Sequence, residues 1–156
     1  MTRIDIEIED RAWSEALPAA GRLARQAAVA AARLADGGSI IILLTGAKAV
    51  KDLNARFLLR DEETNVLSFP SAPNGEGHLG DIALAFEVCA REALAQNKPL
   101  GDHLQHLVIH GVLHLLGYDH DAEGPAVRME SLERGMLARL GVPDPYRRAE
   151  DHQHVR

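Results

Sequence analysis

The sequence predicts one α/β (α+β) domain, with a mixed sheet of about four strands packed against about five helices. Segments of helical and extended hydrophobic pattern follow one another along the chain. No repeat, linker or low-complexity boundary interrupts its 156 residues, which are enough to bury a core without disulfides. We place the domain at residues 1–148 and expect residues 149–156 to form a disordered tail.

The first half of the chain predicts two strands and two helices. Residues 3–9 alternate isoleucine with charged residues, which indicates a strand with one buried face. Residues 39–45 form a continuous apolar run typical of a central strand covered on both faces. Helices are expected at residues 18–34 and 47–57, the second with Val50, Leu53 and Phe57 facing inward. In the first of these, three arginines are expected to face solvent: Arg22, Arg25 and Arg33.

The second half predicts a hairpin followed by three helices. Two short apolar segments, residues 65–69 and 79–85, flank a turn-forming stretch from Pro73 to Gly77. Asp102 is the expected N-cap of the middle helix. The three helices are expected at residues 86–96, 102–116 and 125–140.

Composition argues against several classes of function. The formal net charge of −6 is unfavourable for a surface that coats nucleic acid broadly, and the low aromatic content is unfavourable for a platform that stacks bases. Cys89 is the only cysteine, which excludes a thiolate-rich structural zinc site and fits a reducing cytosol. No signal-like core and no run near the ~20 apolar residues of a membrane span occurs, so we expect a cytoplasmic protein without a membrane partner.

The segment from His110 to His120 carries the strongest chemical signal. His110 and His114 are four residues apart, so a helix would project both imidazoles from one face. Gly117 tolerates the positive φ that ends a helix, and His120 then follows close enough to complete a three-imidazole site. Three neutral imidazoles leave a tetrahedral ion one open position, as in catalytic zinc sites. We therefore predict one Zn²⁺ per chain, bound by His110, His114 and His120.

The spacing His-x-x-x-His-x-x-Gly-x-x-His also matches that of the metzincin metalloproteases, with one difference. Those enzymes carry a glutamate directly after the first histidine as general base, and this chain has Gly111 there. A peptidase is therefore a minor alternative.

Four further polar residues near these segments have two interpretations each. His106, one turn before His110, is either a partly exposed helix residue or a proton-handling group near the metal. Asp119 and Asp121 flank His120 and could orient an imidazole or replace that ligand. Asp81 interrupts an apolar strand, so it is either exposed at a sheet edge or orients the site or a basic residue.

Residues 46–60 contain four basic side chains and only one acidic side chain, Asp52. If this helix and the loop after it border the metal cleft, their side chains would contact phosphate groups. The alternative is a solvated helix face. The cations are Lys48, Lys51, Arg56 and Arg60.

Three sequence blocks occur in a fixed order along the chain. They are Asp61-x-x-Thr64-Asn65-Val66-Leu67-Ser68-Phe69-Pro70, Leu79-Gly80-Asp81-Ile82 and His110-Gly111-x-Leu113-His114-Leu115-Leu116-Gly117-Tyr118-Asp119-His120. In type and order these blocks resemble the YbeY endoribonucleases, bacterial factors of rRNA maturation. The likeness covers about residues 40–146.

The resemblance implies a zinc-dependent, single-strand-specific endoribonuclease that acts in small-subunit (16S) rRNA 3′-end maturation and in ribosome quality control. Its implied partners are rRNA and the small ribosomal subunit, with ribosome-associated proteins as further candidates. The implied mechanism is metal-assisted phosphodiester hydrolysis, with the metal hydroxide or His106 as base. Two alternatives stay open: a ribosome assembly factor with a structural metal, and a metal hydrolase of a non-RNA substrate.

The same resemblance suggests which other residues meet the RNA. The family usually carries an arginine at the position of Leu58, and Arg60 or Arg56 could reach the same space. We assign Arg60 to the catalytic step, together with His106, and Lys48, Arg56 and Ser68 to substrate binding.

Overall fold

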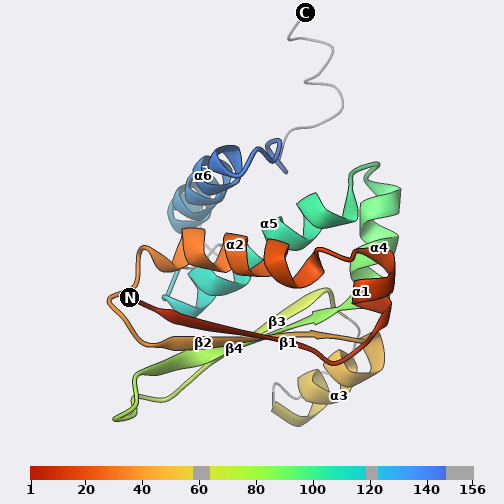
Figure 1. Ribbon diagram of the computed structural model, residues 1–156. Coiled ribbons are helices and arrows are strands. Elements are labelled where there is room, and N and C mark those ends of the chain that lie inside the picture. Colours follow the sequence, from red (N-terminus) through yellow and green to blue (C-terminus); the bar gives the residue numbers. More distant parts are fainter. Residues whose placement is uncertain (58–63, 119–122, 147–156) are drawn as a thin grey trace, which may run out of the picture.

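The computed structural model describes residues 1–57, 64–118 and 123–146, and it contains a four-stranded sheet with helices on both faces (Figure 1). The strands are β1 (Arg3–Ile8), β2 (Ser39–Thr45), β3 (Val66–Pro70) and β4 (His78–Ala85). The helices in these ranges are α1 (Ala12–Ala16), α2 (Ala20–Ala32), α3 (Ala47–Phe57), α4 (Phe86–Ala95), α5 (Leu100–Leu115) and α6 (Glu123–Arg139). This confirms the expected fold class, with the short α1 as an additional helix. The tail expected at residues 149–156 lies outside the described ranges.

The strands lie in the order β1-β2-β4-β3. β1 and β4 each pair with β2 in parallel, whereas β3 pairs with β4 antiparallel, as the predicted hairpin requires. β2 is therefore an interior strand between two parallel neighbours, and β3 is an edge strand. The continuous apolar run of β2 is explained by this position, since a strand covered on both faces has no solvent side.

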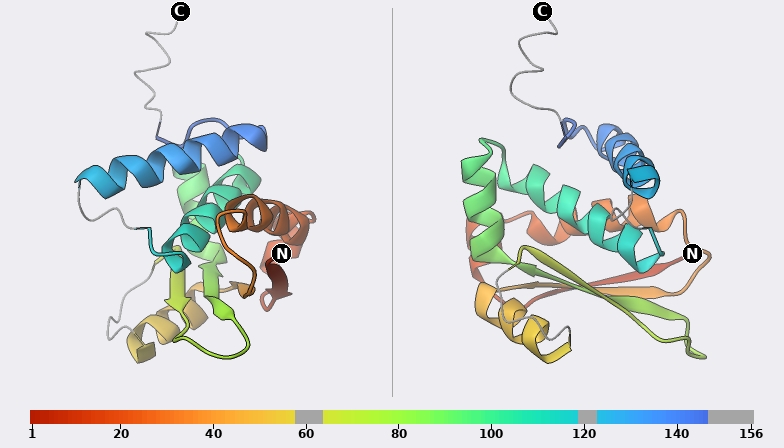
Figure 2. Two further views of the ribbon diagram at one scale, coloured as in Figure 1. Left: turned by 90° about the vertical axis from the view of Figure 1, so that its left-hand side faces the viewer. Right: turned by 180° about the vertical axis from the view of Figure 1, so that it is seen from behind.

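Successive side chains of the central strands point to opposite faces of the sheet and pack into two separate hydrophobic cores. Ile40 and Ile42 of β2 are fully buried in the larger core, which includes α2 and α5. Leu43 points to the smaller core, where Val50 of α3 packs against Ala83 of β4. Figures 1 and 2 show the same division, with α3 on one face of the sheet and α2, α5 and α6 on the other.

Two expectations about the helices need correction. Phe57, expected to point inward, is 61% exposed at the end of α3 and contacts the ring of Phe69 instead. α5 begins earlier than expected, with Pro99 rather than Asp102 at the N-cap, so that Asp102 lies in the first turn, where a negative charge favours the helix dipole. Within the described ranges, no helix combines the length and apolar character that crossing a membrane requires.

α5 lies close against the β3–β4 hairpin, and a glycine makes this approach possible. A Cβ atom on Gly111 would lie 3.0 Å from Cγ2 of Ile82 and 3.2 Å from Oγ of Ser68. The hydroxyl of Ser68 donates a hydrogen bond to the Gly111 carbonyl at 3.1 Å. Position 111 thus faces the sheet, and a glutamate there would meet strand atoms rather than a cleft. This gives a structural reason for the missing protease base.

We expect replacement of Gly80 by alanine to destabilise the fold strongly. The new Cβ would lie 2.4 Å from the carbonyl oxygen of Phe69 and 2.6 Å from Cδ2 of Leu115, so β3 and α5 would both have to shift. Urea denaturation should show a loss of about 3 kcal/mol in the free energy of unfolding. The matched control is Gly75→Ala, whose Cβ would meet no atom within 4 Å and which should stay within about 0.5 kcal/mol of the parent. Equal stability of the two variants would contradict this packing.

Candidate functional site

A row of histidines follows one face of α5 toward its C-terminal end. The ring centroids of His106 and His110 are 6.4 Å apart, and those of His110 and His114 are 4.7 Å apart with the rings nearly perpendicular. The fold therefore brings two predicted zinc ligands together on adjacent turns of the helix, as their spacing indicated. The third predicted ligand, His120, lies outside the described residues.

A buried carboxylate from α6 meets this row. The side chain of Glu133 is fully buried, and its Oε1 lies 2.6 Å from Nδ1 of His110. Its Oε2 lies 3.6 Å from Nε2 of His106 and accepts a hydrogen bond from the hydroxyl of Tyr146. Burial raises the pKa of Glu133, but the hydrogen bonds from the two histidines and the tyrosine outweigh it and lower the pKa to about 2. Glu133 is therefore an ionised carboxylate with partners on both oxygens.

The carboxylate determines which nitrogen of His110 is available. An ionised carboxylate is only an acceptor, so Nδ1 of His110 must carry the proton in this hydrogen bond. In neutral imidazole, Nε2 then holds the lone pair. Histidine ligands of metal ions commonly donate their other ring N–H to a carboxylate, which fixes the ring and makes the ligand more basic. The pair of His110 and Glu133 has this arrangement.

His106 shares the same carboxylate from one turn away. Its side chain is 14% exposed, and its Nε2 lies 3.3 Å from the hydroxyl oxygen of Tyr146. Nδ1 of His106 is buried and has no hydrogen-bond partner in the part of the chain that the structure describes. His106 is thus linked to His110 through Glu133, and its role with protons stays a prediction.

His110 and His114, the two predicted ligands that the structure describes, are suitable ligands for zinc. Within residues 1–57, 64–118 and 123–146, no group of three histidine, cysteine or acidic side chains could hold a metal ion. The predicted site needs His120, which falls between two of these ranges. Two adjacent imidazoles, one with its second nitrogen bound to a carboxylate, are the ligand chemistry that zinc prefers. The zinc site therefore remains a prediction with two of its three ligands in place.

His103 lies one turn before His106 on α5, but its side chain is buried in the interior and is not part of the candidate site. Its side chain is only 3% exposed, with Nε2 at 2.9 Å from Oε1 of Glu92. The amide of Asn65 donates to the same oxygen at 2.9 Å. Desolvation by burial lowers the pKa of His103, which favours the neutral ring. These contacts tie the start of β3 to α4 and α5.

The predicted substrate-binding residues lie at different distances from the row. Ser68 touches the backbone of α5 through its bond to Gly111. Lys48 and Arg56 lie on α3, on the opposite face of the sheet from α5 and α6 (Figure 1). The structure does not bring these two cations together with the histidines, and their contacts with RNA stay predictions. Arg60 lies outside the described residues.

Asp81 has a basic partner near the start of β4. Its Oδ1 lies 2.7 Å from Nε2 of His78, whose Nδ1 lies 2.9 Å from Oγ of Ser39. The side chain of Asp81 is also 44% exposed, but β4 is an interior strand, so the contact with His78 supports the second interpretation and the sheet-edge position is wrong. Ser39, His78 and Asp81 are also the residue types of a serine-hydrolase triad. In such a triad, however, Nε2 of the histidine faces the serine and Nδ1 faces the aspartate, and here the two nitrogens are exchanged. The backbone N–H of Ser39 is bonded to the carbonyl of Gly77. We therefore assign this group to structure.

Sequence reasoning missed Glu133 and Tyr146. Glu133 stands four residues after Met129 and four before Leu137, both of which are buried. An acid at this spacing on the apolar face of a helix signals a buried charge that requires partners. Tyr146 offers no such pattern, because it follows the last helix and reaches Glu133 only through the fold.

Comparisons with known proteins point to one family. A family model described as Endoribonuclease YbeY matches residues 4–141. A protein of Maricaulis maris named Endoribonuclease YbeY is 48% identical over 149 residues, covering 94% of this chain and 92% of its own. One of the same name from Paramagnetospirillum magneticum is 47% identical over 155 residues, covering 92% and 94%. The solution structure of TM1509 from Thermotoga maritima, 23% identical, covers 95% of this chain and all of its own with a TM-score of 0.55, which supports the fold.

Proposed function

The chain belongs to the YbeY endoribonuclease family and is an endoribonuclease, and from this premise we propose that it is a zinc-dependent enzyme that cuts single-stranded RNA. We propose further that it acts in the 3′-end maturation of 16S rRNA and in ribosome quality control. Its proposed partners are rRNA and the small ribosomal subunit, and its proposed location is the cytoplasm. The family supports the RNA substrate, and the α5 histidines support the metal.

The observation that carries the zinc proposal is the contact between Nδ1 of His110 and the buried carboxylate of Glu133 at 2.6 Å. This contact leaves Nε2 of His110 as the ligand nitrogen. His114 adds a second imidazole on the next turn, with its ring centroid 4.7 Å away. We propose His120 as the third ligand.

The chemistry that bound zinc supplies is polarisation of the phosphoryl group and activation of a water molecule. Glu133 holds the proton of His110 at Nδ1 and fixes the orientation of that ring. His106 can accept or release a proton at Nε2, close to the hydroxyl of Tyr146. Arg60 is proposed to stabilise the negative charge that develops on the phosphoryl oxygens, in place of the family arginine found here as Leu58. Arg56 is the second candidate for that task.

The remaining predicted contacts place the RNA around one edge of the sheet. β3 is the edge strand beneath α5, and α3 lies on the opposite face. A strand of RNA that met both the histidine row and Lys48 or Arg56 would therefore have to pass the β3 edge. Ser68, on β3, lies along that route, and its hydroxyl oxygen can accept a further hydrogen bond while it donates to Gly111.

Chelation and re-addition of zinc test this proposal. Protein stripped with a chelator should not cut a labelled single-stranded RNA, and stoichiometric Zn²⁺ should restore the cutting. The same RNA annealed to its complement should resist cleavage, because the proposed substrate is single-stranded. Full activity of the stripped protein would overturn the zinc dependence. Equal cutting of the duplex would overturn the single-strand preference.

A further inference from the structure

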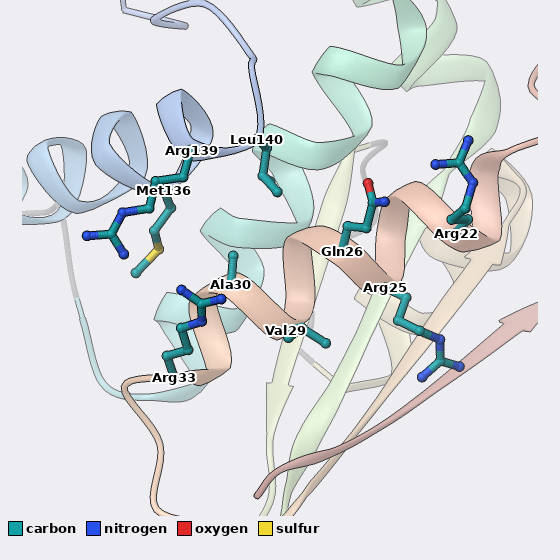
Figure 3. Close-up of a pocket in the computed structure, with 9 residues that line it drawn as sticks. All are labelled: Arg22, Arg25, Gln26, Val29, Ala30, Arg33, Met136, Arg139 and Leu140. Atoms are coloured by element: carbon teal, nitrogen blue, oxygen red, sulfur yellow. The ribbon is translucent and has the colours of Figure 1, made fainter.

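A groove of about 590 Å³ lies between α2 and α6. Its apolar lining comes from Val29 and Ala30 of α2 and from Met136 and Leu140 at the end of α6. The polar lining consists of Gln26 and four arginines, whose side chains Figure 3 shows together with the apolar ones. The arginines are Arg22, Arg25, Arg33 and Arg139.

The arginines form a stripe because of their spacing in the sequence. Arg22, Arg25, Val29 and Arg33 follow one another at intervals of three or four residues, which places them along one face of a helix. The arginines of α2 are exposed, as expected from the sequence. Arg139 reaches the groove from α6, and Figure 3 shows it at the same end as Arg33.

The charge of the groove is opposite to that of the whole chain. The chain has 23 acidic and 17 basic residues, yet within the described ranges no aspartate or glutamate lines this groove. In the described part of the chain, no acidic side chain pairs with Arg22, Arg33 or Arg139. Arg25 donates a hydrogen bond to the backbone carbonyl of Ile4 at 2.7 Å, so its guanidinium is partly engaged. Three guanidinium groups that have no acidic partner among the described residues therefore line one groove.

We propose that this groove binds the phosphate backbone of RNA, as a second contact surface of the enzyme. The guanidinium group presents paired N–H donors that match phosphate oxygens, and the substrate of an endoribonuclease is a chain of phosphates. None of the described side chains that line the groove is aromatic, so these residues offer no stack for bases and should bind RNA without sequence preference. The inference rests on the proposed action on single-stranded RNA.

The groove and the histidine row share one helix. α6 supplies Met136 and Arg139 to the groove and Glu133 to His110. RNA held by the arginines would therefore lie against the helix that supports the proposed zinc site. This arrangement would add affinity for long RNA without any contact to its bases.

The test compares two double variants of the full chain that remove the same charge. The first is Arg33→Gln with Arg139→Gln. The second, a control, is Arg3→Gln with Arg11→Gln, since both of these arginines are exposed and neither lines the groove. Binding of a labelled single-stranded RNA of mixed sequence is followed by fluorescence anisotropy at several salt concentrations. A chelator is present throughout, so that cleavage does not enter the measurement.

We expect the groove variant to raise Kd about 10-fold and to reduce the slope of log K against log salt by about 1 to 2, because up to two phosphate contacts are lost. The control should change Kd less than about 2-fold. Equal effects of the two variants would overturn the proposal, since they would reflect net charge alone. Unchanged RNA binding together with weaker co-sedimentation with the small ribosomal subunit would assign the groove to a protein partner and would also overturn it. A gel of the same samples shows whether the RNA stays intact, so a failure of the proposed zinc dependence would appear as cut RNA and would be distinguished from a loss of binding.

Discussion

The His114→Ala variant should lose bound zinc and should cut single-stranded RNA at least about 100-fold more slowly than the parent, since it removes one of three proposed ligands. The site would keep only His110 and His120, which is too few protein ligands for a zinc ion in a catalytic site. Elemental analysis and a cleavage assay on the same preparation measure both effects. The fold should persist, because His114 is only partly buried near the end of α5.

His78→Ala is the matched control for this experiment. His78 is also a partly exposed histidine, but it lies at the start of β4 and contacts Ser39 and Asp81. It should keep both zinc and cleavage. A His114→Ala protein that retains the cleavage rate of the parent would remove the histidine row from the reaction.

The Glu133→Gln variant should weaken zinc binding by about 10- to 100-fold, the range found when the hydrogen-bond partner of a histidine ligand is lost. Glutamine has the size of glutamate but lacks the negative charge that His110, His106 and Tyr146 contact. Competition with a chromophoric chelator measures the affinity. Nitrogen-15 NMR of the imidazoles adds a second readout, since the proton of His110 should no longer stay on Nδ1.

Glu130→Gln provides the control one turn earlier on α6. Its carboxylate is 34% exposed and lies 3.7 Å from Arg134, so its loss should change zinc affinity little. If Glu130→Gln and Glu133→Gln bound zinc equally well, the buried carboxylate would have no part in holding the metal.

The hydrophobic pattern predicted most of the fold because each pattern has a local cause. The continuous apolar run of residues 39–45 marked an interior strand, and the turn after Pro70 marked the hairpin of β3 and β4. The spacing of His110 and His114 marked a shared helix face, which the structure confirms. These features depend on periods of two or 3.6 residues, which are written in the sequence itself.

Other features depend on contacts between distant segments, and the sequence could not predict them. Glu133 and His110 are 23 residues apart, and only the packing of α6 on α5 brings them together. His103 is buried beside Glu92, and nothing near it in the sequence indicates this partner. The arginine groove likewise needs α2 and α6 side by side, although the solvent-facing arginines of α2 were expected from their spacing.

The position of Gly111 shows how structure changes the meaning of a motif. In the sequence it reads as the place where a protease would carry its base. In the fold it lies where α5 packs against Ile82 and Ser68, so a large side chain would collide with the hairpin. The glycine at position 111 is therefore explained by the packing of α5 on the hairpin as well as by the absence of a protease base.

The most direct measurement is the zinc content of purified protein, determined on the same sample whose cleavage of single-stranded RNA is assayed. We expect one zinc per chain, with activity that falls in proportion as the metal is removed. Protein that holds no metal and still cuts RNA at its full rate would contradict the account.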